Sequence, residues 1–227
     1  PTAATVPLHS SSAAAGPIIL SPRDWYIQRV SEELACIVAA FYPEPVNIRL
    51  SDFKSNEYRQ LSGGSSHEAF EENPMLGFRG ASRYTHPLYC AGFHLELAAI
   101  KRMRDVLGLH NVQVMLPFVR SVLEAQQCVE LIKEHVCSDM YINMMVELPQ
   151  NVYSIRAYSN VGIHGYSIGS NDLIQLTLGC DRDNQVLAGC GYLPLEDKAV
   201  HTLIQTAISE AHRSHAQIGL CGEAACD

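Results

Sequence analysis

The sequence lacks the features that mark several large classes of protein. No apolar run reaches the roughly 18 residues of a membrane span, so none is expected. There is no CxxC pair and no HExxH motif, which leaves a zinc site without support. There is also no GxGxxG after a first strand and no GxxxxGK followed by Ser or Thr. Nucleotide binding within this chain is therefore not expected.

Positive charge is also scarce. The chain has 16 Lys and Arg against 24 Asp and Glu, which gives a formal net charge of −8. Such a field repels nucleic acid and anionic lipid, so neither is expected as a partner. An anionic small-molecule substrate has to be captured by arginines placed locally.

Composition and length are those of an ordinary globular domain. Of the 227 residues, 47% are hydrophobic and 7% aromatic, and one substantial core is expected. A chain of this size does not need disulfides. The eight cysteines lie mostly within apolar runs such as 33–38, and we predict that most are small buried hydrophobic side chains.

Residues 1–20 differ from the remainder of the chain. They are rich in Ala, Ser and Pro and contain no Lys or Arg, so they resemble neither a signal peptide nor a transit peptide. We predict a poorly ordered leader at 1–20 and one domain at 21–227. The domain begins with a helix, because Ser21 and Pro22 fit its N-cap and first position. The predicted buried face of this helix is Val30, Leu34, Ile37, Val38 and Phe41.

Strand-like and helix-like segments alternate through the rest of the chain. The predicted strands are 46–50, 112–118, 141–148, 165–168 and 218–221. Helices are predicted at 122–136 and 200–214, and a further helix has Phe93, Leu97, Ile100, Met103 and Leu107 as its buried face. Continuous apolar strands separated by amphipathic helices indicate a parallel sheet covered by helices. This pattern allows a barrel or an open doubly wound sheet.

Polar residues gather where the predicted strands end, at Arg49, Glu147, Asn171, Asp172 and Cys221. In a (β/α)8 barrel the carboxyl ends of many strands form the catalytic face, so we predict a TIM-type (β/α)8 barrel. Two strand-end carboxylates that converge on one hard cation are the usual ligands of Mg²⁺. Taken singly, each acid also fits a solvated or helix-capping role, and Cys221 fits a core thiol. Arg79 and Arg83, four residues apart, also fit one exposed helical face.

Longer runs carry a resemblance to a known family. Residues 46–58, 71–84, 169–173 and 221–223 resemble, in collinear order, the C-terminal barrel of the phosphoenolpyruvate (PEP) synthases. These belong to the PEP-utilising enzymes, together with pyruvate, phosphate dikinase and enzyme I of the sugar phosphotransferase system. The resemblance covers 21–227 and implies a barrel that binds pyruvate or PEP with Mg²⁺.

The resemblance also implies a role for each motif residue. Glu147 and Asp172 would ligate Mg²⁺ and contact the substrate, while Arg49 and Arg79 would hold the phosphate. Cys221 would move a proton at C3 of the substrate, because a thiol beside cations can serve as an acid or base. The remaining substrate contacts that the resemblance implies are Arg83, Gly169, Ser170 and Asn171.

The resemblance further implies what the whole enzyme needs. In this family a phosphohistidine on a separate swivelling domain supplies the phosphoryl group, and neither that domain nor a nucleotide-binding domain is in this sequence. The family's barrel also extends beyond both ends of the matched region, so we predict a barrel that is incomplete at both ends. We do not expect complete ATP-driven PEP synthesis from this polypeptide alone. A cytoplasmic role in gluconeogenesis is implied, and a homodimer remains open.

Three functions remain open from the sequence. The first is the substrate-binding domain of a PEP synthase, which works with its partner domains. The second is a stand-alone Mg²⁺-dependent lyase that cleaves a C–C bond of a 2-oxo acid. The third is a remnant without catalysis. Exchange of the pyruvate methyl protons separates the first from the third, and aldehyde release would indicate the lyase.

Overall fold

A curved, all-parallel sheet forms the centre of the molecule. The computed structural model describes residues 20–181, 183–191 and 197–222, so the leader predicted at 1–20 lies outside it except for Leu20. Within these residues the strands pair in sequence order: β1 (Val46–Arg49), β2 (Val112–Leu116), β3 (Ile142–Val146), β4 (Gly165–Gly169) and β5 (Gln217–Cys221). Each strand matches a predicted one to within two residues at either end.

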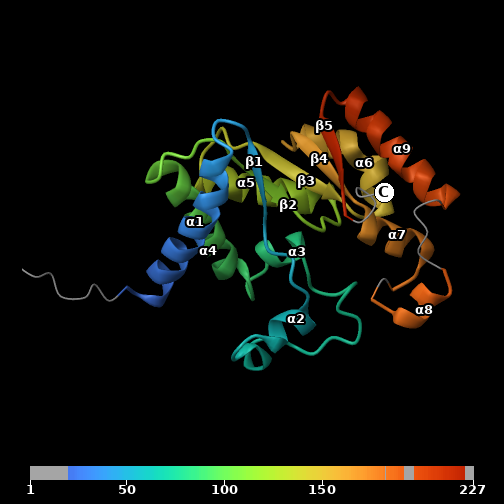
Figure 1. Cartoon of the computed structure of the whole chain (residues 1–227), viewed down its shortest axis with the longest axis horizontal. Coiled ribbons are helices and arrows are strands. Elements are labelled where there is room, and N and C mark those ends of the chain that lie inside the picture. Colours follow the sequence, from blue (N-terminus) through green and yellow to red (C-terminus); the bar gives the residue numbers. More distant parts are fainter. Residues whose placement is uncertain (1–19, 182, 192–196, 223–227) are drawn as a thin grey trace, which may run out of the picture.

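The register brings the carboxyl ends of the strands together. Arg49 pairs with Met115, and Gly169 pairs with Cys221. The sheet curls like one side of a barrel (Figure 1). The predicted α/β fold with parallel strands is therefore confirmed. The described residues form a five-stranded sheet, and the full count of eight strands is not seen among them.

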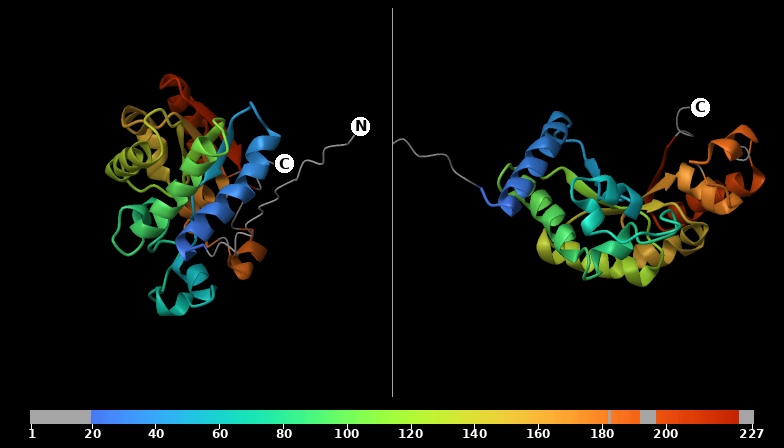
Figure 2. Two further views of the ribbon diagram at one scale, coloured as in Figure 1. Left: turned by 90° about the vertical axis from the view of Figure 1, so that its left-hand side faces the viewer. Right: turned by 90° about the horizontal axis from the view of Figure 1, so that it is seen from below.

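Long helices cover the outer side of the curve (Figure 2), and all but the first of them connect successive strands. They are α1 (Pro22–Ala40), α4 (Cys90–Asp105), α5 (Val122–His135), α6 (Pro149–Asn160) and α9 (Lys198–Arg213). Shorter elements include α2 (Ser55–Gln60), η1 (Gly64–Ser66), α3 (Ala81–Tyr84), α7 (Ser170–Leu178) and α8 (Gln185–Gly189). Of these, α2 and α8 lie beyond the carboxyl ends of the strands (Figure 1). None of the described helices is long and apolar enough to cross a membrane.

The predicted start of the first helix is confirmed. The Ser21 hydroxyl accepts a hydrogen bond from the Asp24 N–H at 3.1 Å, and Pro22 occupies the first turn. Each group suits its place, because the first N–H groups of a helix need external acceptors and proline has no N–H to satisfy.

The predicted core is largely present, with three corrections. On α4, the side chains of Phe93, Leu97, Ile100 and Met103 are buried as predicted. Leu107 lies beyond the last turn of that helix and is exposed. Ile37 and Phe41 are 54% and 60% exposed, so the prediction that they are buried is wrong. Helix α1 packs against α4 and buries Val38, while Ile37 and Phe41 lie off that contact.

The prediction that most cysteines are buried is also wrong. Of those that the structure describes, Cys128 and Cys180 are buried, while Cys36 and Cys190 are exposed. Cys36 lies in an apolar run, but that run is helical and one of its sides faces solvent. An apolar run in a helix does not bury every member, because successive side chains point in different directions.

Candidate active site

A cavity of about 480 Å³ opens at the carboxyl ends of the strands. Residues from the ends of β1, β3, β4 and β5 line it, together with the loop after β1. Most of the predicted site residues are among them: Arg49, Arg79, Glu147, Gly169, Ser170, Asn171, Asp172 and Cys221. The parallel register explains this convergence, because it places the last residue of every strand at the same edge.

Three carboxylates meet in this cavity. Asp52 follows β1, Glu147 follows β3, and Asp172 lies in the first turn of α7. An oxygen atom of each lies within 4.8 Å of the others. Glu147 and Asp172 are buried, and the Asp52 side chain is 5% exposed. Such a set of carboxylate oxygens suits a hard divalent cation, and Mg²⁺ in particular takes one or two carboxylates from the protein.

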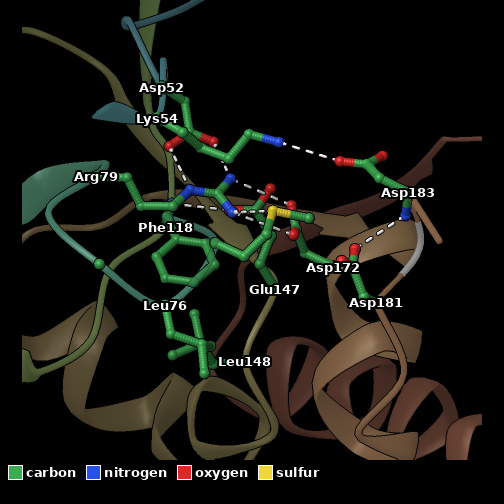
Figure 3. Close-up of polar contacts among 12 residues, drawn as sticks. Asp52, Lys54, Leu76, Arg79, Phe118, Glu147, Leu148, Asp172, Asp181 and Asp183 are labelled. Atoms are coloured by element: carbon green, nitrogen blue, oxygen red, sulfur yellow. Dashed lines mark hydrogen bonds and ion pairs between the residues drawn. The ribbon is translucent and has the colours of Figure 1, made fainter. Parts of the chain in front are cut away.

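Arg79 is shared between two of these acids (Figure 3). Its Nε and Nη2 atoms donate to the Asp52 carboxylate at 3.2 and 2.6 Å. Its Nη1 and Nη2 atoms donate to the Asp172 carboxylate at 3.3 and 3.4 Å. Burial opposes the charge of Arg79, but its bonds and attraction to both acids raise the guanidinium pKa above its ordinary value. The guanidinium therefore stays charged and neutralises part of the acid cluster.

Contacts with Phe118 and Arg120 hold the backbone around Arg79 in place. Gly80 has a φ of +63°, and a Cβ there would lie 2.6 Å from the Cβ of Phe118. Glycine therefore allows this segment to approach Phe118 closely, and the Arg79 guanidinium lies 4.0 Å from the centre of that ring. Arg120 donates to the Arg79 carbonyl at 3.0 Å and to the Gly77 carbonyl. These contacts position the guanidinium without using its own donors.

The surroundings of Glu147 change its pKa. Burial, with repulsion from Asp172 and Asp52, raises the pKa of Glu147 to about 8. The Phe118 N–H donates to its Oε2 at 2.8 Å and opposes that rise. Gly169 leaves room for the side chain, because a Cβ there would lie 2.7 Å from the Cγ of Glu147.

Cys221, at the end of β5, lines the same cavity. Its Sγ donates to the Ile168 carbonyl of the neighbouring strand at 3.3 Å. Ser170 donates its hydroxyl to the Cys221 carbonyl at 3.0 Å and so ties the end of β5 to the start of α7. Gly222 follows with a φ of +101°, where a Cβ would lie 2.6 Å from the Ser170 oxygen. Hydrogen bonds from the thiol and to the carbonyl of Cys221 thus fix the end of β5.

Sequence comparison identifies the family to which this chain belongs. Residues 22–227 match the family described as PEP-utilising enzyme, PEP-binding domain. The chain belongs to this family. Phosphoenolpyruvate synthase of Aeropyrum pernix is 44% identical to this chain over 203 residues, which is 88% of this chain and 25% of the relative.

Bacterial relatives give the same result. Phosphoenolpyruvate synthase of Deinococcus radiodurans is 44% identical over 91% of this chain and 27% of its own length. That of Escherichia coli is 43% identical over 91% of this chain and 26% of its own length. The chain spans about a quarter of the length of these relatives.

Arg83 lies outside the lining of the cavity. It is 1% exposed, and Arg79 is 2% exposed, so the alternative of an exposed helical face is wrong for both. The Arg83 guanidinium donates to both oxygens of Glu68 at 2.7 and 2.9 Å and to the Phe78 carbonyl at 2.6 Å. Through that carbonyl it supports the residue that precedes Arg79.

Sequence reasoning missed several residues of the site. Asp52 and Lys54 line the cavity but were assigned no role, although both lie in the quoted run 46–58. Asn151 was also missed, and its Oδ1 accepts hydrogen bonds from the N–H groups of Glu147 and Leu148 at 3.2 and 2.9 Å. The signal for Asn151 was Pro149, which marks the start of α6 immediately after the Glu147 motif.

The raised pKa of Glu147 predicts how stability depends on pH without a metal. Between about 4.5 and about 8, the folded chain holds a proton on Glu147 that the unfolded chain has released. The free energy of unfolding of the metal-free protein should therefore fall as pH rises through this window. Urea titrations with a chelator present measure this slope. The slope should be smaller in Glu147→Gln, and an equal slope in both proteins would contradict the assignment.

Proposed function

We propose that this domain binds PEP and pyruvate with Mg²⁺ and promotes enolisation of pyruvate, as the PEP-binding part of a PEP synthase. One observation carries the proposal. A single cavity holds the three buried acids, the two arginines and the thiol, in a chain of the PEP-utilising family. The acids can bind a cation, the arginines can bind an anion, and the thiol can donate or accept a proton. Those are the needs of a reaction that interconverts an enol phosphate and a 2-oxo acid.

The acids fit a resident Mg²⁺. Glu147 and Asp172 would hold it, because both are buried and their carboxylates lie close together. When bound, the cation would supply electrostatic stabilisation for the negative charge of the enolate. Asp52, the third acid, accepts from Arg79 at 3.2 and 2.6 Å, closer than Asp172 does at 3.3 and 3.4 Å, so we assign it the role of orienting that arginine.

The remaining lining residues would bind and orient the substrate. Arg49 and Arg79 would hold the phosphate, for which planar guanidinium forks are well suited. Cys221 would give or take the proton at C3, while Gly169, Ser170 and Asn171 shape the wall between the metal and the thiol. Arg83 would act through the Phe78 carbonyl and so position Arg79.

The phosphoryl group would come from a phosphohistidine on another domain. The relatives are about three and a half times as long as this chain, which leaves room in them for further domains. We therefore propose that the domain handles the pyruvate half of the overall reaction. A cytoplasmic place in gluconeogenesis follows from the same assignment.

Proton exchange tests the proposal directly. The protein is incubated in deuterated water with pyruvate and Mg²⁺, and the methyl signal is followed by NMR. Loss of the signal at a rate above that of Mg²⁺ alone supports enolisation in this cavity. Formation of an aldehyde would instead indicate a lyase, and no change of either kind would indicate a domain without catalysis.

The metal assignment gives a separate prediction. Glu147→Gln and Asp172→Asn should each weaken Mn²⁺ binding by at least about tenfold, because each removes one of two anionic ligands. Calorimetry with Mn²⁺ alone measures the effect. Asp139→Asn is the matched control, since this acid is 78% exposed and its loss also removes one negative charge. Unchanged Mn²⁺ affinity in both site variants would refute the assignment.

A further inference from the structure

Lys54 is a cation of the cavity that the proposed function has not used. It lies in the loop after β1, lines the cavity, and is 8% exposed. Its backbone is fixed, because its N–H donates to the Glu57 carboxylate at 2.7 Å and its carbonyl accepts from the Tyr58 N–H at 3.0 Å. A lysine is seldom so deeply buried without a partner for its charge.

The partners of the Lys54 ammonium are weak. Its Nζ lies 3.3 Å from Oδ2 of Asp183, whose side chain is 63% exposed (Figure 3). It also lies 3.8 Å from the Glu57 carboxylate, which is 41% exposed. Ion pairs with acids that water reaches contribute little, about 0–1 kcal/mol. The ammonium can therefore exchange Asp183 for a stronger anion at small cost.

The two arginines of the cavity would not by themselves supply enough free donors for a phosphate. Arg79 already makes four hydrogen bonds to Asp52 and Asp172, so a phosphate has to share it with both acids. Arg49 is exposed, and within the described ranges it makes no hydrogen bond or ion pair. Lys54 comes from the same loop as Asp52 and follows Arg49 by five residues. Its side chain lines the same cavity as both arginines.

We propose that Lys54 is a third cationic ligand of the phosphate, and that Asp183 holds its ammonium while the anion is absent. This inference rests on the proposed function and extends it by one residue. Lysine suits the role, because its compact ammonium binds phosphate as a point charge. The Asp183 N–H donates to the Asp181 carboxylate at 3.0 Å, which fixes the backbone of Asp183. The Asp183 carboxylate therefore competes with the phosphate from a defined position.

Opposite effects of two variants test the inference. PEP and pyruvate are titrated by calorimetry into the full chain with Mn²⁺ present. Lys54→Met should weaken PEP binding by about tenfold, the value of one charged hydrogen bond, and change pyruvate binding much less. Asp183→Asn should strengthen PEP binding, because it removes the competitor. In the Lys54→Met background, Asp183→Asn should have no effect on PEP affinity.

The controls separate this inference from the proposed function. Lys198→Met removes one exposed positive charge and should leave PEP affinity unchanged. Retained Mn²⁺ affinity shows that each variant is folded. If the wild-type chain binds Mn²⁺ but no PEP, the proposed function fails and the inference fails with it. If the wild-type chain binds PEP, then unchanged affinity in Lys54→Met, or weaker binding in Asp183→Asn, would overturn the role of Lys54 alone.

Discussion

Replacing Cys221 by serine should slow the Mg²⁺-dependent exchange of pyruvate methyl protons by roughly 10²–10⁴-fold, the usual contribution of a general acid or base. PEP affinity should change little, because ground-state binding comes from the metal and the cationic side chains. Serine is close to cysteine in size and can still donate to the Ile168 carbonyl, as Sγ does at 3.3 Å. The strand end should therefore keep its geometry while the acid–base group is lost.

Cys36→Ser is the control for this experiment. Cys36 is an exposed thiol on α1, and its replacement should leave exchange unchanged. NMR gives the exchange rate and calorimetry gives the PEP affinity of the same samples. If Cys221→Ser exchanges at the wild-type rate, the thiol is a structural part of the β5 end and another group moves the proton.

Arg79→Met should destabilise the domain as well as abolish PEP binding. The guanidinium neutralises the buried acid cluster, and removing one partner of a buried ion pair typically costs about 3–5 kcal/mol. The lost ring contact with Phe118 adds to that cost. Urea titration at neutral pH measures the free energy of unfolding.

Arg49→Met is the matched control for Arg79→Met. It also removes one arginine from the cavity, but Arg49 is exposed and makes no ion pair among the described residues. PEP affinity should fall in both variants, whereas the free energy of unfolding should fall only in Arg79→Met. Equal stability of the two variants would mean that Arg79 contributes nothing net to the folded state.

The central strand β3 could be predicted because its side chains are mostly apolar on both faces of the sheet. All the residues of β3 are buried, and the corresponding run in the sequence is almost continuously apolar. The helices were harder. Helix α6 was missed because its first turns are polar. Ile37 and Phe41 were misassigned because the apolar pattern of a helix does not show how much of its surface a neighbouring helix covers. That covered area depends on the neighbour, which here is α4.

From the residues alone the site could be predicted where it lies at strand ends, whereas Arg79, in the loop before α3, was predicted only through the family resemblance. Glu147 and Asp172 follow apolar strands, and parallel topology alone brings such residues together. Asp52 and Lys54 lie in a polar loop, where no periodicity distinguishes them from solvated residues, and within the motif run 46–58 only Arg49 was given a role. The Glu68 partner of Arg83 was also unpredictable, because that pair depends on the path of an irregular segment.

The position of Arg79 between Asp52 and Asp172 has a thermodynamic consequence. Under the proposed function, a divalent cation at Asp172 and the guanidinium compete for the same carboxylate oxygens. Cation binding would weaken the hold of Asp172 on Arg79 and make more of its donors available to a phosphate. By linkage, the phosphate must then raise the affinity for the cation by the same factor. The two ligands of this pocket should therefore bind with positive cooperativity, whichever of them arrives first.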